Sequence, residues 1–552
     1  MKYVYLFFAL CIPLMLSAQF PSIQWEYPLG APAFGSAAAA DLDDDGFYEI
    51  VFTTYTNDGR AHCLNAEDGS VKWIFDLGGC GDVAPLIGDV NNDGKLEVII
   101  NGSCNPTIFC LDGATGEVIW SQPSGGGDSP PTMADIDQDN MPEVLFGNFD
   151  GQIRVLNGED GSIAKIIQAI PDGRAIQTEP TLVDVNADGK LDILGANYFN
   201  DEGLFVKAFD YESGLPIWTN EKIVPGADLH AYHGGAVADI DNDGLPEYVI
   251  GSGAGLVYAI NLEDGSDLWT LELNASNMSA ISIADLDADG ALEVVFNNND
   301  YLTFDQRIWV LNGADGLEEW SYPVSFTSFR GMSISDINGN GQLDLVSGHF
   351  MGMLRAVEPY TGLIWEMDLR EEFAEANNFP WFETDHQPLI ADFDQNGTMD
   401  VFAVAGYGTY TPDSLNTGKA FMIEAGIGNC PEWLMFRHDV LRSGYLSPEE
   451  VDLACQTTAA ADLDQLSLSV HLFPNPHSGT FTLEFDLPHS SAVKIDLYDC
   501  LGRPISNLVP ATEMSGSQQL QLNCPEQLSA GIYLLLLEVD GVRSGYKAME
   551  LH

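Results

Sequence analysis

Short apolar runs alternate with turns rich in Gly and Asp over most of the chain. One apolar run leads into an acidic stretch, as at residues 85–89, and a second run leaves it, as at residues 96–100. A third run ends in Leu-Asn, as at residues 155–157, and a fourth follows a Gly turn and ends near Trp, as at residues 116–120. No stretch shows the period of an amphipathic helix. The pattern therefore predicts an all-β protein built from four-stranded antiparallel units.

The acidic stretch recurs eight times with the same spacing of acids. Repeats of about 50 residues are typical of architectures in which each unit buries its apolar face only against its neighbours. The sequence thus predicts an array of similar units. The copies begin at Asp41, Asp89, Asp135, Asp184, Asp239, Asp285, Asp336 and Asp392.

Each nine-residue copy offers the ligands that Ca²⁺ prefers. Carboxylates or amides at positions 1, 3 and 5 can wrap one ion, the carbonyl of position 7 adds a ligand and the acid at position 9 closes the shell, while Gly at position 6 permits the bend. A plain Asp/Gly turn is the alternative for a single copy, but the recurrence favours calcium. The predicted metal ligands are Asp41, Asp43, Asp45, Glu49, Asp89, Asn91, Asp93, Glu97, Asp135, Asp137, Asp139, Glu143, Asp184, Asn186, Asp188, Asp192, Asp239, Asp241, Asp243, Glu247, Asp285, Asp287, Asp289, Glu293, Asp336, Asn338, Asn340, Asp344, Asp392, Asp394, Asn396 and Asp400.

Two copies depart from the pattern. The third has Asn140 where Gly is expected, and Asn also enters left-handed conformations. The seventh places Asn338 and Asn340 between Asp336 and Asp344, so only two of its side-chain ligands are charged. We expect the seventh loop to be the weakest calcium site.

With these motifs, residues 30–446 resemble the FG-GAP (VCBS-type) calcium-binding repeats of integrin α-chain propellers and of many secreted bacterial proteins. The resemblance implies a β-propeller with calcium loops on one face and ligand-binding loops on the other. Integrins use seven blades, but eight motifs favour eight here, with seven as the alternative. Residues 23–27 resemble a fourth strand without its first three, so we expect them to complete the last blade.

The N-terminus indicates a secreted protein. Lys2 precedes an apolar run over residues 3–16, which reads as a signal peptide cut near Ala18. We expect a signal peptide at 1–18, a propeller at 19–446, a linker at 447–468 and a second domain at 469–552. Disulfides or buried free thiols are then expected for the remaining eight cysteines. The candidate pairs are Cys500 with Cys524, Cys430 with Cys455, and Cys104 with either Cys80 or Cys110.

The second domain shows alternating strands and turns that predict a small β-sandwich. Its Pro474-Asn-Pro476, its strand over residues 493–498 and its Gly531-Ile-Tyr533 resemble the C-terminal sorting domain of the type IX secretion system of Bacteroidota. The resemblance implies the type IX machinery as a partner, passage through the periplasm, and release from or attachment to the outer cell surface. An unrelated terminal β-domain is the alternative.

The net charge of the chain restricts the classes of partner that it is expected to bind. The chain has 83 acidic residues against 21 Lys and Arg, for a formal net charge of −62. Such a surface repels phosphate backbones, so no nucleic-acid partner is expected. Beyond the signal peptide, no segment is apolar enough to predict a transmembrane helix.

Candidate ligand-binding residues lie in the segments before the first strands, on the face expected opposite the calcium loops. Aromatic, His and Arg side chains at a propeller mouth suit an unknown carbohydrate or protein ligand. Inter-blade packing and loop capping are the alternative roles. These candidates are His230, Tyr232, His233, Arg330, Trp381 and His386.

The sequence carries no Gly-x-Ser-x-Gly elbow, no His-Glu-x-x-His and no phosphate loop, and we assign no catalytic residue. The expected function is non-catalytic binding or adhesion outside the cell. A calcium-dependent carbohydrate-active enzyme such as a polysaccharide lyase is the alternative, with the His and Arg cluster supplying a base and a cation. A quinoprotein dehydrogenase, suggested by the Trp-rich blade ends, is a third possibility without a cofactor motif.

Overall fold

The chain divides into two compact units, Met1–Gln456 and Thr457–His552, and each is described by itself. The predicted signal peptide and linker lie outside the described residues. The computed structural model describes residues 21–170, 175–198, 203–223, 229–273, 277–299, 305–325, 330–374, 382–384, 386–408, 415–433, 435, 471–473, 480–499, 504–523, 531–539 and 542–551.

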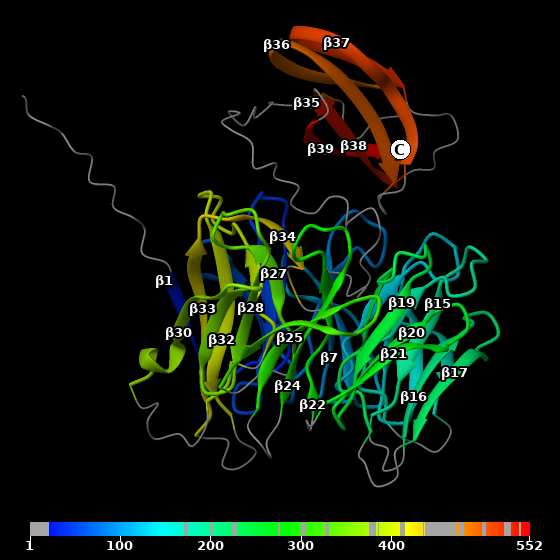
Figure 1. Cartoon of the computed structure of the whole chain (residues 1–552), viewed down its shortest axis with the longest axis vertical. Helices are drawn as coiled ribbons and strands as arrows, with labels where there is room; N and C mark the ends of the chain where they lie inside the picture. The colour runs from blue at the N-terminus through cyan, green and yellow to red at the C-terminus, as the bar shows by residue number, and fades with distance from the viewer. Residues whose placement is uncertain are drawn as a thin grey trace, which may run out of the picture. The chain divides into compact units, whose positions relative to one another are not determined.

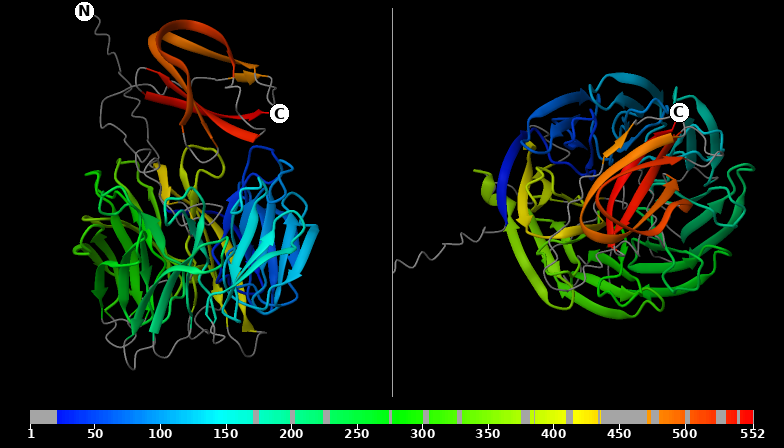
Figure 2. Two further views of the ribbon diagram at one scale, coloured as in Figure 1. Left: turned by 90° about the vertical axis from the view of Figure 1, so that its right-hand side faces the viewer. Right: turned by 90° about the horizontal axis from the view of Figure 1, so that it is seen from above.

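The first unit is an eight-bladed β-propeller, as the repeat count predicts (Figure 1). Seen from above, the blades follow one another around a ring in chain order (Figure 2). Blade 1 consists of β2 (Ala38–Ala40), β3 (Glu49–Thr53), β4 (Arg60–Asn65) and β5 (Val71–Asp76), and blade 2 of β6 (Leu86–Gly88), β7 (Glu97–Asn101), β8 (Thr107–Asp112) and β9 (Val118–Pro123). Blade 3 consists of β10 (Thr132–Ala134), β11 (Glu143–Gly147), β12 (Gln152–Asn157) and β13 (Ile163–Gln168), and blade 4 of β14 (Thr181–Val183), β15 (Asp192–Ala196), β16 (Gly203–Phe209) and β17 (Pro216–Ile223).

The second half of the ring keeps this order with three variations. Blade 6 gains the short strand β22, blade 7 gains β34 and is followed by the 3₁₀ turn η1, and blade 8 takes its fourth strand from the N-terminus. Blade 5 consists of β18 (Ala236–Ala238), β19 (Glu247–Gly251), β20 (Leu256–Asn261) and β21 (Asp267–Glu272), and blade 6 of β22 (Asn277–Met278), β23 (Ser282–Ala284), β24 (Glu293–Asn299), β25 (Arg307–Asn312) and β26 (Glu318–Pro323). Blade 7 consists of β27 (Ser333–Asp336), β28 (Asp344–His349), β29 (Met353–Glu358), β30 (Gly362–Asp368) and β34 (Asn429–Trp433), and η1 (Leu369–Glu372) follows β30. Blade 8 consists of β31 (Leu389–Ala391), β32 (Met399–Tyr407), β33 (Thr417–Gly426) and β1 (Ser22–Leu29).

Strand β1 closes the ring. It pairs antiparallel with β33, so Trp25 lies opposite Met422 in the eighth sheet. Figure 2 shows this blue strand beside the yellow strands of the last blade. The expectation that residues 23–27 supply the missing fourth strand is therefore confirmed.

The core lies between the blades. First strands of neighbouring blades contact one another and are short, because little room remains near the axis; β2, for example, is Ala-Ala-Ala. The second strands are buried almost throughout, as in Glu49–Thr53. Their apolar side chains pack between adjacent sheets, which is the burial that a repeat protein needs from its neighbours.

In five blades, a Trp on the fourth strand donates a hydrogen bond to a backbone carbonyl of the next blade. Trp73 donates its Nε1–H to the Gly113 carbonyl of blade 2 at 2.7 Å. Its ring lies under Gly116, whose φ is 71°; a Cβ there would come within 2.7 Å of the ring. Glycine is therefore required both by the left-handed backbone and by the close approach. The same bond is made by Trp25, Trp120, Trp218 and Trp269.

Segment β34 adds an inner strand to blade 7. It pairs with β27, so Asn429 lies opposite Asp336. The chain reaches it from β33 through Gly428, whose N–H donates to the Ile337 carbonyl at 3.3 Å. Residues 428–433 thus pass along the seventh acidic loop and beside the first strand of blade 7.

The described strands of the second unit form one antiparallel sheet in the order β35-β36-β38-β39, with β37 paired to β36. The sandwich predicted for this unit remains a prediction. In the described part of the chain, no helix is long and apolar enough to cross a membrane. The strands are β35 (His471–Phe473), β36 (Thr480–Asp499), β37 (Pro504–Asn523), β38 (Gly531–Val539) and β39 (Val542–Leu551).

Candidate functional site

The eight acidic loops connect the first and second strands of their blades, and they share one backbone cage. In the first loop the two carboxylate oxygens of Asp41 accept the N–H groups of Asp45 and Gly46 at 3.1 and 2.9 Å. Asp45 accepts the N–H of Phe47 at 2.9 Å. The corresponding bonds recur in the other seven loops. These bonds hold the side chains of positions 1 and 5, which are acids or Asn, on the inside of the turn.

Two positions of each loop are left-handed. Position 6 is Gly in seven loops, and Asn140 takes its place in the third loop with φ 73°, as its residue type predicts. Position 4 is also left-handed, which the sequence pattern did not reveal. Ala187 and Ala288 adopt φ 56° and 60° there, a conformation that costs a non-glycine residue energy.

The closing acid at position 9 is buried in every loop. Glu49 and its seven counterparts are at most 2% exposed. Each accepts the backbone N–H of position 2, as Glu49 does from Leu42 at 2.8 Å. Burial, followed by the neighbouring acids of the loop, raises the pKa of Glu97 to about 7 and that of Glu247 to about 8. A cation held by the loop would offset this cost of ionisation.

The donor set fits a calcium ion. Two oxygens that bind one Ca²⁺ at 2.3–2.6 Å are at most about 5 Å apart. Three carboxylate oxygens lie within 4.8 Å of one another in five loops. The other three loops carry Asn at position 3, whose amide oxygen is an equivalent ligand. The acids involved in the five clusters are Asp41, Asp43 and Asp45; Asp135, Asp137 and Glu143; Asp239, Asp241 and Glu247; Asp285, Asp287 and Asp289; Asp392, Asp394 and Asp400.

The seventh loop has an acid that sequence reasoning missed. Glu358, at the end of β29, accepts the side-chain amides of Asn338 at 3.2 Å and Asn340 at 2.6 Å. Burial, with Glu358 and Asp336 nearby, raises the pKa of Asp344 to about 8. This loop therefore gathers a third carboxylate from a different strand.

Neighbouring loops are linked around the acidic face by side-chain amides at position 4. Asn92 donates to the Asn140 carbonyl of the next loop at 2.8 Å, and Gln138 donates to the Gly189 carbonyl at 2.8 Å. Gln395 of the eighth loop reaches the Gly46 carbonyl of the first loop at 2.5 Å. The last link crosses the closure of the ring.

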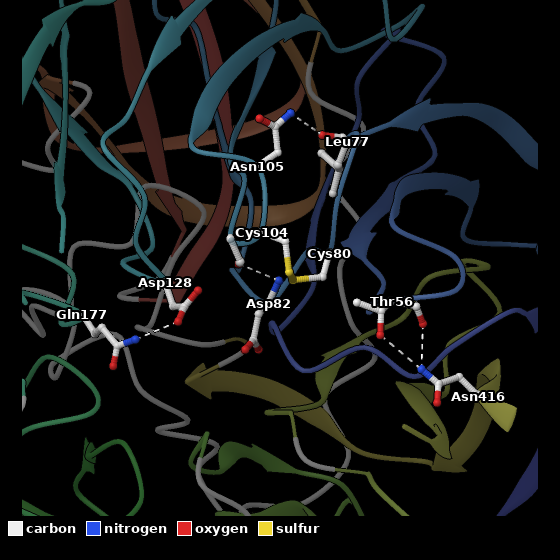
Figure 3. Close-up of a disulfide and its surroundings, with 10 residues drawn as sticks. Thr56, Leu77, Cys80, Asp82, Cys104, Asn105, Asp128, Gln177 and Asn416 are labelled. Carbon is white, nitrogen blue, oxygen red and sulfur yellow. Dashed lines mark hydrogen bonds between the residues drawn. A yellow bond between two sulfur atoms is a disulfide. The ribbon is translucent and has the colours of Figure 1, made fainter. Parts of the chain in front are cut away.

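On the opposite face, side chains from five blades meet at the mouth of the propeller. We call Asp82, Asp128, Gln177, Tyr232 and Arg330 the mouth cluster. Arg330, before β27, donates to Asp82 Oδ1 at 3.1 Å and lies 5.4 Å from the Tyr232 ring centroid. Gln177 donates to Asp128 Oδ2 at 2.7 Å (Figure 3). Blades 2 and 7 are three steps apart around the ring, so Arg330 spans the mouth.

The structure separates the predicted ligand-binding residues. His386 is buried; its Nε2 accepts the Val404 N–H at 2.5 Å and its Nδ1 lies 3.1 Å from the Gln387 carbonyl. Burial lowers the pKa of His386 to about 4. Its ring thus holds blade 8 together, which is the packing role weighed as the alternative. Trp381 lies outside the described residues.

The remaining candidates form an aromatic group around Tyr198. Its ring lies 5.1 Å from His230 and 5.5 Å from Tyr232, and Tyr232 lies 4.8 Å from His233, all edge-on. His233 is buried, whereas Tyr198, His230 and Tyr232 are partly exposed. Sequence reasoning located this face but missed Tyr198, which follows a second strand, and the acids Asp82 and Asp128. For Asp82 and Asp128, the available signal was their position before the first strands of blades 2 and 3.

A disulfide joins Cys80 and Cys104 beside the mouth cluster (Figure 3). This confirms one of the two predicted partners of Cys104, and Cys110 is instead a buried free thiol, as is Cys63. Asp82 follows Cys80 by two residues, and its N–H is held by Ser103 at 3.0 Å. The side chains of the other candidate cysteines lie outside the described residues.

An eight-bladed propeller with acidic loops on one face defines the class of the first unit. The pattern of the FG-GAP-like repeat matches residues 89–146 and 135–195, and that of the secretion system C-terminal sorting domain matches residues 471–547. The pattern described as outer membrane protein assembly factor BamB matches residues 203–429. The chain therefore carries FG-GAP-like repeats and a type IX sorting domain, and the sorting domain implies secretion or a cell-surface location.

Solved structures share the fold at low identity. A europium-containing methanol dehydrogenase is 11% identical, with a TM-score of 0.53 over 73% of this chain and 93% of its own. A quinohemoprotein alcohol dehydrogenase from Pseudomonas putida HK5 is 12% identical, with a TM-score of 0.50 over 83% of this chain and 79% of its own. At these identities the likeness shows the propeller fold alone. No curated protein matches the sequence.

Proposed function

We propose that the protein is a secreted or cell-surface calcium-binding propeller that acts as a non-catalytic binding or adhesion protein. The sorting domain would direct it through the periplasm and across the outer membrane by the type IX machinery. The propeller would then present the mouth cluster to a carbohydrate or protein ligand. The eightfold acidic cage is the observation that supports calcium as a structural cofactor.

The residues suited to calcium are the loop acids and amides at positions 1, 3, 5 and 9. When bound, the ion would neutralise the carboxylates that the buried closing acids bring together. The cages lie on one face, and the mouth cluster lies on the other, so we assign calcium a structural role. It would hold the blade cores in register while the opposite face contacts the ligand.

The chemistry of the mouth cluster favours binding over turnover. A lyase needs a base close to the abstracted proton and a cation to stabilise the developing charge. His386 is committed to backbone groups of its own blade, and Arg330 is paired with Asp82. Partly exposed Tyr198 and Tyr232, beside two carboxylates, instead suit sugar rings or polar side chains through stacking and hydroxyl hydrogen bonds.

The test is an array of glycans and extracellular proteins probed with the full secreted chain in saturating calcium. Bound glycans are then incubated with the protein and examined for unsaturated uronate products. We expect binding without products, and a Tyr198→Ala variant should bind roughly 5–150-fold more weakly, the range of about 1–3 kcal/mol for an anchor residue. Tyr48→Ala, on the acidic face, is the matched control and should bind normally. Product formation would replace this proposal by the lyase.

A further inference from the structure

A β-bulge recurs on the fourth strand of every blade, immediately before a Trp in seven blades and before Lys165 in blade 3. In blade 1, Cys63 pairs with Trp73 and Leu64 pairs with Val71, so Lys72 is the extra residue. A bulge re-aims the side chain of the extra residue. The same register shift is present in the other seven sheets, where the extra residues are Ile119, Ala164, Ile217, Leu268, Glu319, Ile364 and Gln24.

Two polar bulge residues, Lys72 and Gln24, turn toward the acidic loop of their own blade. Lys72 Nζ lies 2.5 Å from Asp43 Oδ2 and 2.8 Å from Glu49 Oε1. Gln24 Nε2 donates to Asp400 Oδ1 at 3.0 Å in blade 8. In blade 6, Glu319 instead accepts the side-chain amide of Asn312 at 2.9 Å and the hydroxyl of Tyr360 at 3.0 Å. Lys72 and Gln24 thus bring a cation and an amide to equivalent places in their loops.

Lys72 is positioned as a built-in cation. Its side chain is 12% exposed, and it joins the position 3 acid to the buried closing acid, two of the groups that calcium would bridge. The ammonium is a compact point charge with three donors, so it can satisfy both carboxylates at once. In the other blades, the bulge residue supplies no such charge, because it is apolar, amide or acidic.

We propose that the bulge residue sets how each acidic loop is neutralised, and that Lys72 takes the place of the calcium ion in the first loop. This inference rests on the proposed calcium binding. It divides the loops into one that is stabilised without metal and others that take calcium with their own ligands.

The test counts calcium ions bound by the full chain in equilibrium dialysis. Lys72→Met removes the ammonium and keeps the length of the side chain, and it should bind about one ion more than the wild type. Ile119→Met, at the same bulge in blade 2, is the matched control and should leave the count unchanged. Ile119→Lys should place an ammonium at the second loop and remove about one ion.

The outcomes separate this inference from the calcium proposal. Equal, non-zero counts for the wild type and Lys72→Met would overturn the role of Lys72 and leave calcium binding intact. No calcium in any variant would overturn both. If Lys72→Met fails to fold, Ile119→Lys decides: a count that does not fall overturns the inference.

Discussion

The two faces of the propeller are built in different ways. On the acidic face, the same hydrogen bonds form eight times, each within nine consecutive residues. On the opposite face, each contact is made once and joins distant residues, as Arg330 and Asp82 do across 248 positions. Local repetition specifies the first face, whereas ring closure specifies the second. The repeated cages suit a role in stability, whereas the mouth cluster, which occurs once, suits the recognition of a specific ligand.

Removing calcium should produce the largest effect and should act on the acidic face. An ion that binds only the folded cage stabilises it by about 2.7 kcal/mol at 100 times its dissociation constant. Several cages therefore add up to an effect on the order of 10 kcal/mol. Thermal unfolding in EGTA should occur at a much lower temperature than in excess Ca²⁺. Equal melting temperatures in EGTA and in excess Ca²⁺, with the EGTA-treated protein shown to be metal-free, would contradict a stabilising role of calcium on the acidic face.

Breaking the pair across the mouth should have a smaller effect and leave the cages intact. Arg330→Met removes the ion pair with Asp82 and should lower the free energy of unfolding by about 3 kcal/mol. The double variant with Asp82→Asn should recover part of the loss, because the carboxylate that pairs with Arg330 is then replaced by an uncharged amide. Chemical denaturation in saturating calcium measures both. A change in the number of bound calcium ions would mean that the faces are coupled.

The pH dependence of His386 should contribute a comparable but graded effect. Because the folded pKa of His386, about 4, lies below the ordinary 6.5, the unfolded chain takes up the proton first as the pH falls. Stability is full above pH 6.5 and falls toward pH 4 by about 1.4 kcal/mol per unit. His386→Gln should lack this component when both proteins unfold in saturating calcium. Parallel pH profiles for the two proteins would contradict the assignment.

The smallest effect should come from the links between loops. Asn92→Ala removes the bond to the Asn140 carbonyl and should cost about 1 kcal/mol. Ala187→Asn, at the same position of the fourth loop, should instead stabilise the protein slightly, because Asn tolerates the left-handed backbone better than Ala. Denaturation midpoints in calcium measure both changes. A loss of stability in Asn92→Ala together with a gain in Ala187→Asn would show that the side chain at position 4 stabilises the loops independently of their carboxylates.

Much of the fold and little of the mouth could be predicted from the sequence. The position of the cages follows from the spacing of the acids, the left-handed Asn140 from its residue type, and the completion of blade 8 from the likeness of residues 23–27 to a fourth strand. The bulge at Lys72 could not be predicted, because it depends on the register between two strands. The burial of His386 could not be predicted either, because it depends on Val404, 18 residues away. Local sequence defines a blade, and the other blades define what surrounds it.

The pairing of β1 with β33 affects both the folding and the unfolding of the propeller. Ser22 and Glu424 are in contact across 402 positions, so the ring cannot close until nearly the whole propeller is present. Before that moment the chain is an open arc with an apolar blade face uncovered at each end. An open solenoid can lose a terminal repeat and persist, since its repeats interact only with neighbours. Here, loss of either end opens the ring, so we expect the eight repeats to unfold as one cooperative unit.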